Sequence, residues 1–150
     1  MEDLRITLVQ AELHWENPTS NRLMFEKHFS AFHEETDILV LPEMFTTGFT
    51  MNASANAETM NGETMEWMRI WTKKKECVIL GSLIIRDNGR YFNRLIWMKP
   101  DGNFETYDKR HLFRLSGEEK VYSLGNKKLI EIIGDKLMFS GINIFGDYLI

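Results

Sequence analysis

The chain has 150 residues, of which 43% are hydrophobic and 12% aromatic, and its formal net charge at pH 7 is −4. This length and composition suffice for one buried core, so we expect a single domain over residues 1–150. Acidic and basic residues are interspersed without a basic stripe, which argues against a nucleic-acid partner.

The sequence also argues against a membrane protein. The apolar run at residues 77–85 is far too short to cross a bilayer, and the start M-E-D-L-R lacks the basic segment of a signal peptide. We therefore expect a cytoplasmic protein without a membrane partner. The single cysteine, Cys77, has no partner for an internal disulfide. The four histidines are too scattered for a zinc site, so no metal is expected: His14, His28, His33 and His111.

A strand, a helix and a second strand are predicted to open the chain. Residues 4–10 first alternate between apolar and polar positions and then form a continuous apolar run. This pattern predicts a first core strand that is buried at its far end. Asn17 and Pro18 provide an N-cap and a favoured first helical position, and three phenylalanines then recur at helical spacing. These signals predict a helix over residues 18–34. A short apolar strand at 37–41 follows, which favours a parallel pair with a crossover helix and an α/β fold.

Glu43 follows the second predicted strand in the segment D-I-L-V-L-P-E. Pro42 restricts the backbone before it, and a carboxylate at the end of a buried strand is partly removed from water. Such a group is suited to act as a general base. The alternative is a polar residue that marks the point where the strand reaches solvent.

A long loop and a second helix are predicted for the middle of the chain. Residues 46–62 are small and polar without a period, and a long ordered loop beside Glu43 is a candidate pocket wall. Residues 63–75 have one apolar side and end in three lysines, which suits the negative end of a helix dipole. The lysines are interpreted as a solvated helix end.

Antiparallel strands are predicted to complete the sheet. The strand at 77–85 is too apolar to be exposed, and D-N-G forms the turn into a strand at 91–98. P-D-G then leads to a short strand at 104–107. The predicted fold is therefore a mixed α/β sheet flanked by helices.

A charged cluster, D-K-R-H-L-F, follows the last of these strands. Lys109 emerges beside apolar residues, where a partly desolvated ammonium could stabilise an oxyanion or pair with a carboxylate. The alternative is a solvated loop. His111 is interpreted as a packed or hydrogen-bonded residue, and no chemistry is assigned to it.

Several motifs occur in an order that resembles the nitrilase (carbon-nitrogen hydrolase) superfamily, and most closely its omega-amidase-like branch. They are L-V-L-P-E-M-F-T-T-G-F, then Gly81-Ser82, then Asn93 with P-D-G, and finally Y-D-K-R-H-L-F. The resemblance spans roughly residues 4–136. It implies an αββα sandwich, of which this chain contains the N-terminal portion.

The resemblance also implies a chemistry. The family hydrolyses amides or nitriles through a covalent thioester, using a Glu, Lys, Cys triad without a metal or cofactor. By resemblance Glu43 is the general base and Lys109 stabilises the tetrahedral intermediate. A second glutamate that positions lysine and substrate corresponds to Glu118 or Glu119. We prefer Glu118, which lies seven residues before Gly125 in the S-L-G-N turn.

The nucleophile of the family is missing from its expected place. A cysteine motif is expected within about a dozen residues of Lys136, but the chain continues L-M-F-S-G-I-N-I-F-G-D-Y-L-I. Cys77 precedes an apolar strand and is interpreted as a small buried hydrophobe. Ser140 lies closest to the missing position, but a serine needs a matched base and oxyanion site, so no role is assigned to it. The tail alternates enough to form a strand.

Two functions follow as expectations. The first is amidase-type hydrolysis of small linear amides, inactive in this chain because the triad is incomplete. The second is a non-catalytic binding or assembly module, with homo-oligomerisation through uncovered apolar faces. The unusual tail is expected to reflect either a shifted reading frame or natural shortening of an ancestral enzyme.

Overall fold

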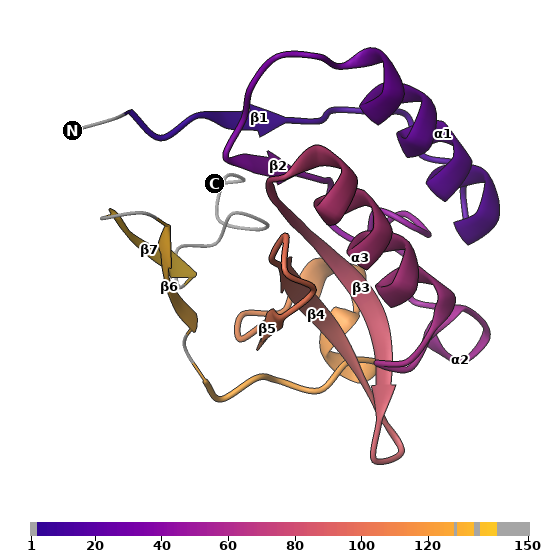
Figure 1. Cartoon of the computed structure of the whole chain (residues 1–150). Coiled ribbons are helices and arrows are strands. Elements are labelled where there is room, and N and C mark those ends of the chain that lie inside the picture. The colour runs from indigo at the N-terminus through magenta and orange to yellow at the C-terminus, as the bar shows by residue number, and fades with distance from the viewer. Residues whose placement is uncertain (1–2, 128, 134–135, 141–150) are drawn as a thin grey trace.

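Five strands form one mixed sheet in the computed structural model, which describes residues 3–127, 129–133 and 136–140 (Figure 1). The sheet order is β1-β2-β3-β4-β5. β1, β2 and β3 pair in parallel, whereas β3, β4 and β5 pair antiparallel. The strands are β1 (Ile6–Leu8), β2 (Ile38–Val40), β3 (Val78–Asp87), β4 (Arg90–Met98) and β5 (Phe104–Asp108). The predicted mixed α/β sheet is confirmed, including its parallel opening.

Two helices, α1 (Pro18–Ala31) and α3 (Glu63–Lys75), cover one face of the sheet (Figure 1). The Asn17 side chain caps α1 by accepting a hydrogen bond from the Ser20 amide at 3.0 Å, as the sequence predicted. The apolar sides of both helices meet the sheet in one core, which includes Phe25, Phe29, Phe45, Trp67, Trp71, Ile79, Leu83 and Ile96. No helix in the described part of the chain is long and apolar enough to span a bilayer.

The hairpin between β3 and β4 matches its prediction. Its turn residues Asn88 and Gly89 both have positive φ, at 48° and 75°, and such turns match the twist of paired strands. Residues 92–98 of β4 are all buried. This buried ladder is the platform on which the charged residues described below are arranged.

The first strand is shorter and more exposed than predicted. β1 covers only three residues and forms the edge of the sheet, with β2 as its one neighbour among the described strands. The side chain of Leu8 is 74% exposed, so the prediction of a core strand buried at its far end was wrong. An edge strand has a neighbouring strand on one side only, so its side chains are less buried. The alternating pattern of residues 4–10 does not show whether a strand lies at the edge or in the centre of a sheet.

The segments predicted as loops contain further short elements. The stretch 46–62 includes α2 (Ala53–Asn56), and Glu58 forms an isolated parallel bridge with Ile85 of β3. After β5 come two 3₁₀ turns, η1 (Arg114–Ser116) and η2 (Glu118–Lys120). β6 (Leu129–Ile133) and β7 (Lys136–Ser140) form a separate hairpin away from α1 and α3 (Figure 1). The rest of the predicted tail strand lies outside the described residues.

Candidate active site

The turn that follows β2 is attached to β3 by a series of hydrogen bonds. The amide of Leu41 donates to the Leu80 carbonyl at 2.7 Å, and the amide of Met44 donates to Oγ of Ser82 at 2.8 Å. Met44 has a φ of 46°, an uncommon left-handed conformation for a residue with a side chain. The strand end and the Ser82 hydroxyl therefore fix the backbone on both sides of Glu43.

Gly81 permits this turn to lie directly on β3. A Cβ atom at position 81 would come within 2.7 Å of the Phe45 ring and 3.1 Å of the Leu41 Cβ. Phe45 is fully buried, so its ring has little room to move away. Residue 81 must therefore lack a side chain if Glu43 is to keep its position.

We expect Gly81→Ala to lower the free energy of unfolding by about 1–3 kcal/mol, the usual cost of overpacking a core. Urea unfolding followed by circular dichroism measures the loss. The double variant Gly81→Ala, Phe45→Leu should recover part of it, because the smaller side chain makes room. Strict additivity of the two losses would show that the contact between residues 81 and 45 is not the cause.

Lys109 lies immediately after β5 and is buried. Its amide donates to the Asn93 carbonyl at 2.9 Å, and its own carbonyl accepts from the Gly125 amide at 3.1 Å. The residue is 6% exposed, and Nζ lies 5.1 Å from the centroid of the Phe49 ring. The alternative interpretation of Lys109 as part of a solvated loop is therefore wrong. Burial beside an aromatic face makes its charge dependent on nearby carboxylates.

Glu118 supplies one of these carboxylates from η2 and is fully buried. Its Oε2 accepts from the Phe113 amide at 2.6 Å and lies 3.0 Å from Nζ of Lys109. Glu119 is exposed on the surface. Of the two glutamates considered for this position, the structure brings Glu118 to the lysine.

Glu43 completes the cluster, so the three residues predicted from the sequence lie together. Its Oε1 is 2.8 Å from Nζ of Lys109, and its side chain is 20% exposed. Burial raises the pKa of Glu43 above its usual value, and the hydrogen bonds and charge from Lys109 oppose that rise in part. A carboxylate that is partly desolvated and still reachable from solvent is suited to exchange protons with a bound molecule.

Asn93 is the residue of this cluster to which the sequence analysis assigned no role. Its Nδ2 donates to Oε1 of Glu43 at 2.6 Å and to Oε1 of Glu118 at 3.2 Å. A single amide within the buried run of β4 was the available signal, because a polar group in such a strand requires partners.

Cys77 lies outside this cluster. It precedes β3 by one residue, whereas the Glu43 turn contacts Ser82, five residues further on and roughly 16 Å along the strand. Burial raises the pKa of the Cys77 thiol to about 11, so it stays protonated at neutral pH. The thiol thus behaves as the buried hydrophobe that the sequence predicted. Ser140 belongs to β7, and its side chain lies outside the described part of the chain.

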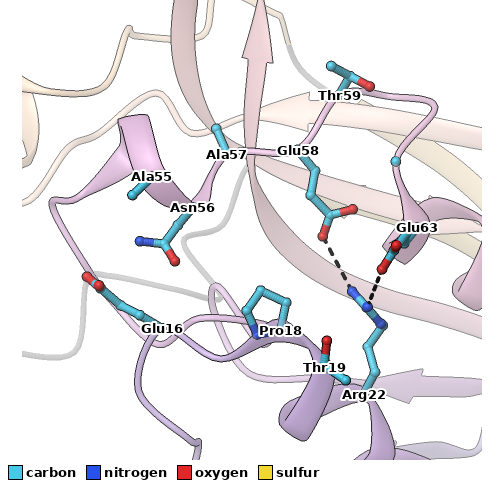
Figure 2. Close-up of a pocket in the computed structure, with 11 residues that line it drawn as sticks. Glu16, Pro18, Thr19, Arg22, Ala55, Asn56, Ala57, Glu58, Thr59 and Glu63 are labelled. Atoms are coloured by element: carbon cyan, nitrogen blue, oxygen red, sulfur yellow. Dashed lines mark hydrogen bonds and ion pairs between the residues drawn. The ribbon is translucent and has the colours of Figure 1, made fainter.

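A separate pocket of about 410 Å³ opens between the start of α1, α2 and the start of α3 (Figure 2). Arg22 lines one side of it, with Nη2 2.6 Å from Glu63 and Nη1 3.8 Å from Glu58. The guanidinium also donates to Oγ1 of Thr64 at 3.0 Å. These contacts tie the two helices together, and the pocket contains none of the residues of the cluster around Lys109.

Known proteins resemble this chain along most of its length. The carbon-nitrogen hydrolase family model matches residues 5–144. The omega-amidase YafV of Yersinia enterocolitica is 38% identical over 141 residues, covering 92% of this chain and 54% of the relative. The 2-oxoglutaramate amidase of Bacillus subtilis is 27% identical and is covered over 48% of its length. The chain thus spans about half the length of the curated relatives it matches.

Solved structures agree with the fold. A CN-hydrolase superfamily protein from Xanthomonas campestris, with an arsenic adduct in its active site, superposes with a TM-score of 0.89 at 37% identity. The match covers 93% of this chain and 52% of that protein. An amidase from Nesterenkonia, whose active-site cysteine has added acrylamide, has a TM-score of 0.78 at 17% identity and shows the fold alone. The chain described here belongs to the carbon-nitrogen hydrolase family.

Proposed function

We propose that this chain supplies the acid–base and electrostatic half of an amidase site for small linear amides. The observation that supports the proposal is the buried contact of one ammonium, Lys109, with two carboxylates, Glu43 and Glu118. The similarity to an omega-amidase and a 2-oxoglutaramate amidase favours omega-amides of short keto acids as substrates.

The proposed reaction uses the three residues in different roles. Glu43 accepts the proton of a thiol as the sulfur attacks the amide carbon, and the resulting oxyanion lies beside Nζ of Lys109. An ammonium has three N–H bonds. In the structure one points to Glu43 and the others to the two oxygens of Glu118, and the longer of the two Glu118 contacts, at 3.2 Å, is the one that the oxyanion would replace. Collapse of the tetrahedral intermediate breaks the C–N bond. The proton on Glu43 moves to the departing nitrogen, which leaves as ammonia. Water then hydrolyses the thioester, and Glu118 keeps Lys109 in place throughout.

The thiol in this scheme must come from outside these 150 residues. Cys77, the one cysteine of the chain, lies away from the cluster and has a raised pKa. We therefore propose that the 150-residue chain by itself binds small amides without turning them over, which corresponds to the binding module considered from the sequence.

Two measurements on the purified chain test this proposal. An omega-amide of a short keto acid at saturating concentration should raise Tm by about 3 °C or more, because it binds the folded state alone. Ammonia release should stay at background. Glu43→Gln should reduce the shift in Tm, whereas Glu119→Gln, which alters an exposed neighbour, should not.

The outcomes separate the parts of the proposal. Ammonia release that Glu43→Gln abolishes would support the amidase site and contradict the need for an outside thiol. Release that persists in Glu43→Gln, or the lack of any stabilisation by amides, would contradict the proposed function itself. Homo-oligomerisation and a cytoplasmic location stay predictions of the sequence, and sedimentation would test the first.

A further inference from the structure

Asn93 occupies an interior position of β4 where an apolar residue would be expected. It is 3% exposed and pairs with Ile84 of β3. Burying an amide costs free energy unless its polar atoms are hydrogen-bonded, so its partners indicate why an amide is tolerated there. These partners are the charged residues of the site.

One residue thus contacts all three members of the cluster. The Asn93 side chain donates to Glu43 at 2.6 Å and to Glu118 at 3.2 Å. Its backbone carbonyl accepts from the Lys109 amide at 2.9 Å. The two carboxylates come from segments far apart in the sequence, and the amide of Asn93 is a common donor to both.

The neutral charge of this donor suits a general base. Among the described residues of the cluster Lys109 supplies one positive charge, so two ionised carboxylates give the cluster a net charge of −1. A second cation at position 93 would stabilise the ionised form of Glu43 strongly and weaken it as a base. An amide supplies hydrogen bonds without adding charge, so the carboxylate is held and remains able to accept a proton.

The contacts also distinguish the two oxygens of Glu43. Both Lys109 and Asn93 donate to Oε1, and no residue in the described part of the chain donates to Oε2. We propose that Asn93 is a positioning residue, which holds Glu43 and Glu118 around Lys109 and leaves Oε2 of Glu43 for proton transfer. The catalytic meaning of this assignment rests on the proposed function, but the contacts exist without substrate.

The experiment is a pH titration of the Glu43 side-chain carboxyl by ¹³C NMR in the full 150-residue chain, assigned by comparison with Glu43→Gln. Asn93→Leu removes both donors at similar volume and should move the Glu43 midpoint upward by about one unit or more, since a hydrogen bond to a charged group is lost. Asn93→Asp keeps the shape and adds a third carboxylate, so its upward shift should be larger.

A merely structural role for Asn93 would change stability and leave this midpoint alone. Thr72→Val is the matched control, because it removes a buried hydroxyl that donates to the carbonyls of Cys77 and Met98, away from the cluster. It should lower Tm with the Glu43 midpoint unchanged. An unchanged midpoint in folded Asn93→Leu would overturn the proposal.

The wild-type chain provides a second readout that does not depend on how the variants fold. The side-chain amide protons of Asn93 should shift with pH at the same midpoint as the Glu43 carboxyl. Amide signals that stay constant through that midpoint would overturn the proposal as well. Neither titration requires turnover. If the amide-binding and ammonia measurements fail, the titrations still show whether Asn93 positions Glu43.

Discussion

Replacing Lys109 by methionine is expected to lower the free energy of unfolding by about 3–5 kcal/mol at pH 8, the cost of removing one partner from a buried ion pair. The variant keeps most of the side-chain volume but leaves Glu43 and Glu118 facing each other without a cation. Glu118 is fully buried and cannot turn toward solvent. Urea unfolding of the two proteins measures the difference.

This loss should depend on pH in a definite direction. Burial already raises the pKa of Glu43, and Lys109 opposes that rise, so Lys109→Met should raise it further. A carboxyl whose pKa is higher in the folded than in the unfolded chain favours folding when protonated. The free-energy cost of burying its charge is absent below the pKa of the unfolded chain, about 4.3, and grows as pH rises through the pKa of the folded chain. The deficit should therefore be smaller at pH 5 than at pH 8.

Two further variants control this prediction. Lys120→Met removes an exposed lysine of η2 and should change stability by no more than about 0.5 kcal/mol. Lys109→Met combined with Glu43→Gln leaves one uncompensated carboxylate rather than two, so part of the loss should return. A deficit of equal size at pH 5 and pH 8, unaffected by Glu43→Gln, would show that lost packing rather than charge is responsible.

Gly125→Ala is expected to cost about 3 kcal/mol, at the upper end of the usual range for overpacking. A Cβ atom at this position would lie 2.0 Å from the carbonyl oxygen of Asp108 and 2.7 Å from its carbon. Both are backbone atoms, so no rotamer change relieves the clash. The amide of Gly125 also donates to the Lys109 carbonyl, and the methyl group should separate these two segments.

The same variant should disturb the site as well as the fold. If the segment around Gly125 moves away, the Lys109 carbonyl loses the hydrogen bond that it accepts from the Gly125 amide. The pH titration of Glu43 should then change together with the stability. Asn126→Ala is the control, because it alters the exposed neighbouring residue and should have little effect on either measurement. A stable Gly125→Ala variant with an unaltered Glu43 titration would refute the close approach of the two backbones.

Local sequence signals predicted the helices and turns well. The predicted bounds of the helix at 63–75 are those observed, and the predicted start of α1 at Pro18 is also correct. Periodicity and capping act over a few residues, so they can be read directly from a sequence. The end of α1 and the exposed position of β1 were not predictable in this way, because they depend on which surfaces the rest of the chain covers.

The candidate site shows the same division. The Pro-Glu strand end and the D-K-R motif indicated Glu43 and Lys109, but these residues are 66 positions apart and their contact could not be inferred from spacing. Resemblance to a known family supplied their pairing as an expectation. Asn93 was overlooked as a functional residue because its importance lies in two carboxylates that reach it from other segments.

By itself, the sequence determined the order of α1, α3 and the five strands of the mixed sheet, and it indicated Glu43 and Lys109, since these follow from local patterns and motifs. The tertiary structure alone decided that Lys109 is buried, that Glu43 and Glu118 both contact its ammonium, and that Asn93 donates to both carboxylates. The physical reason is that burial and charge pairing depend on distances between segments remote in the chain, which the packing of β3, β4 and β5 sets.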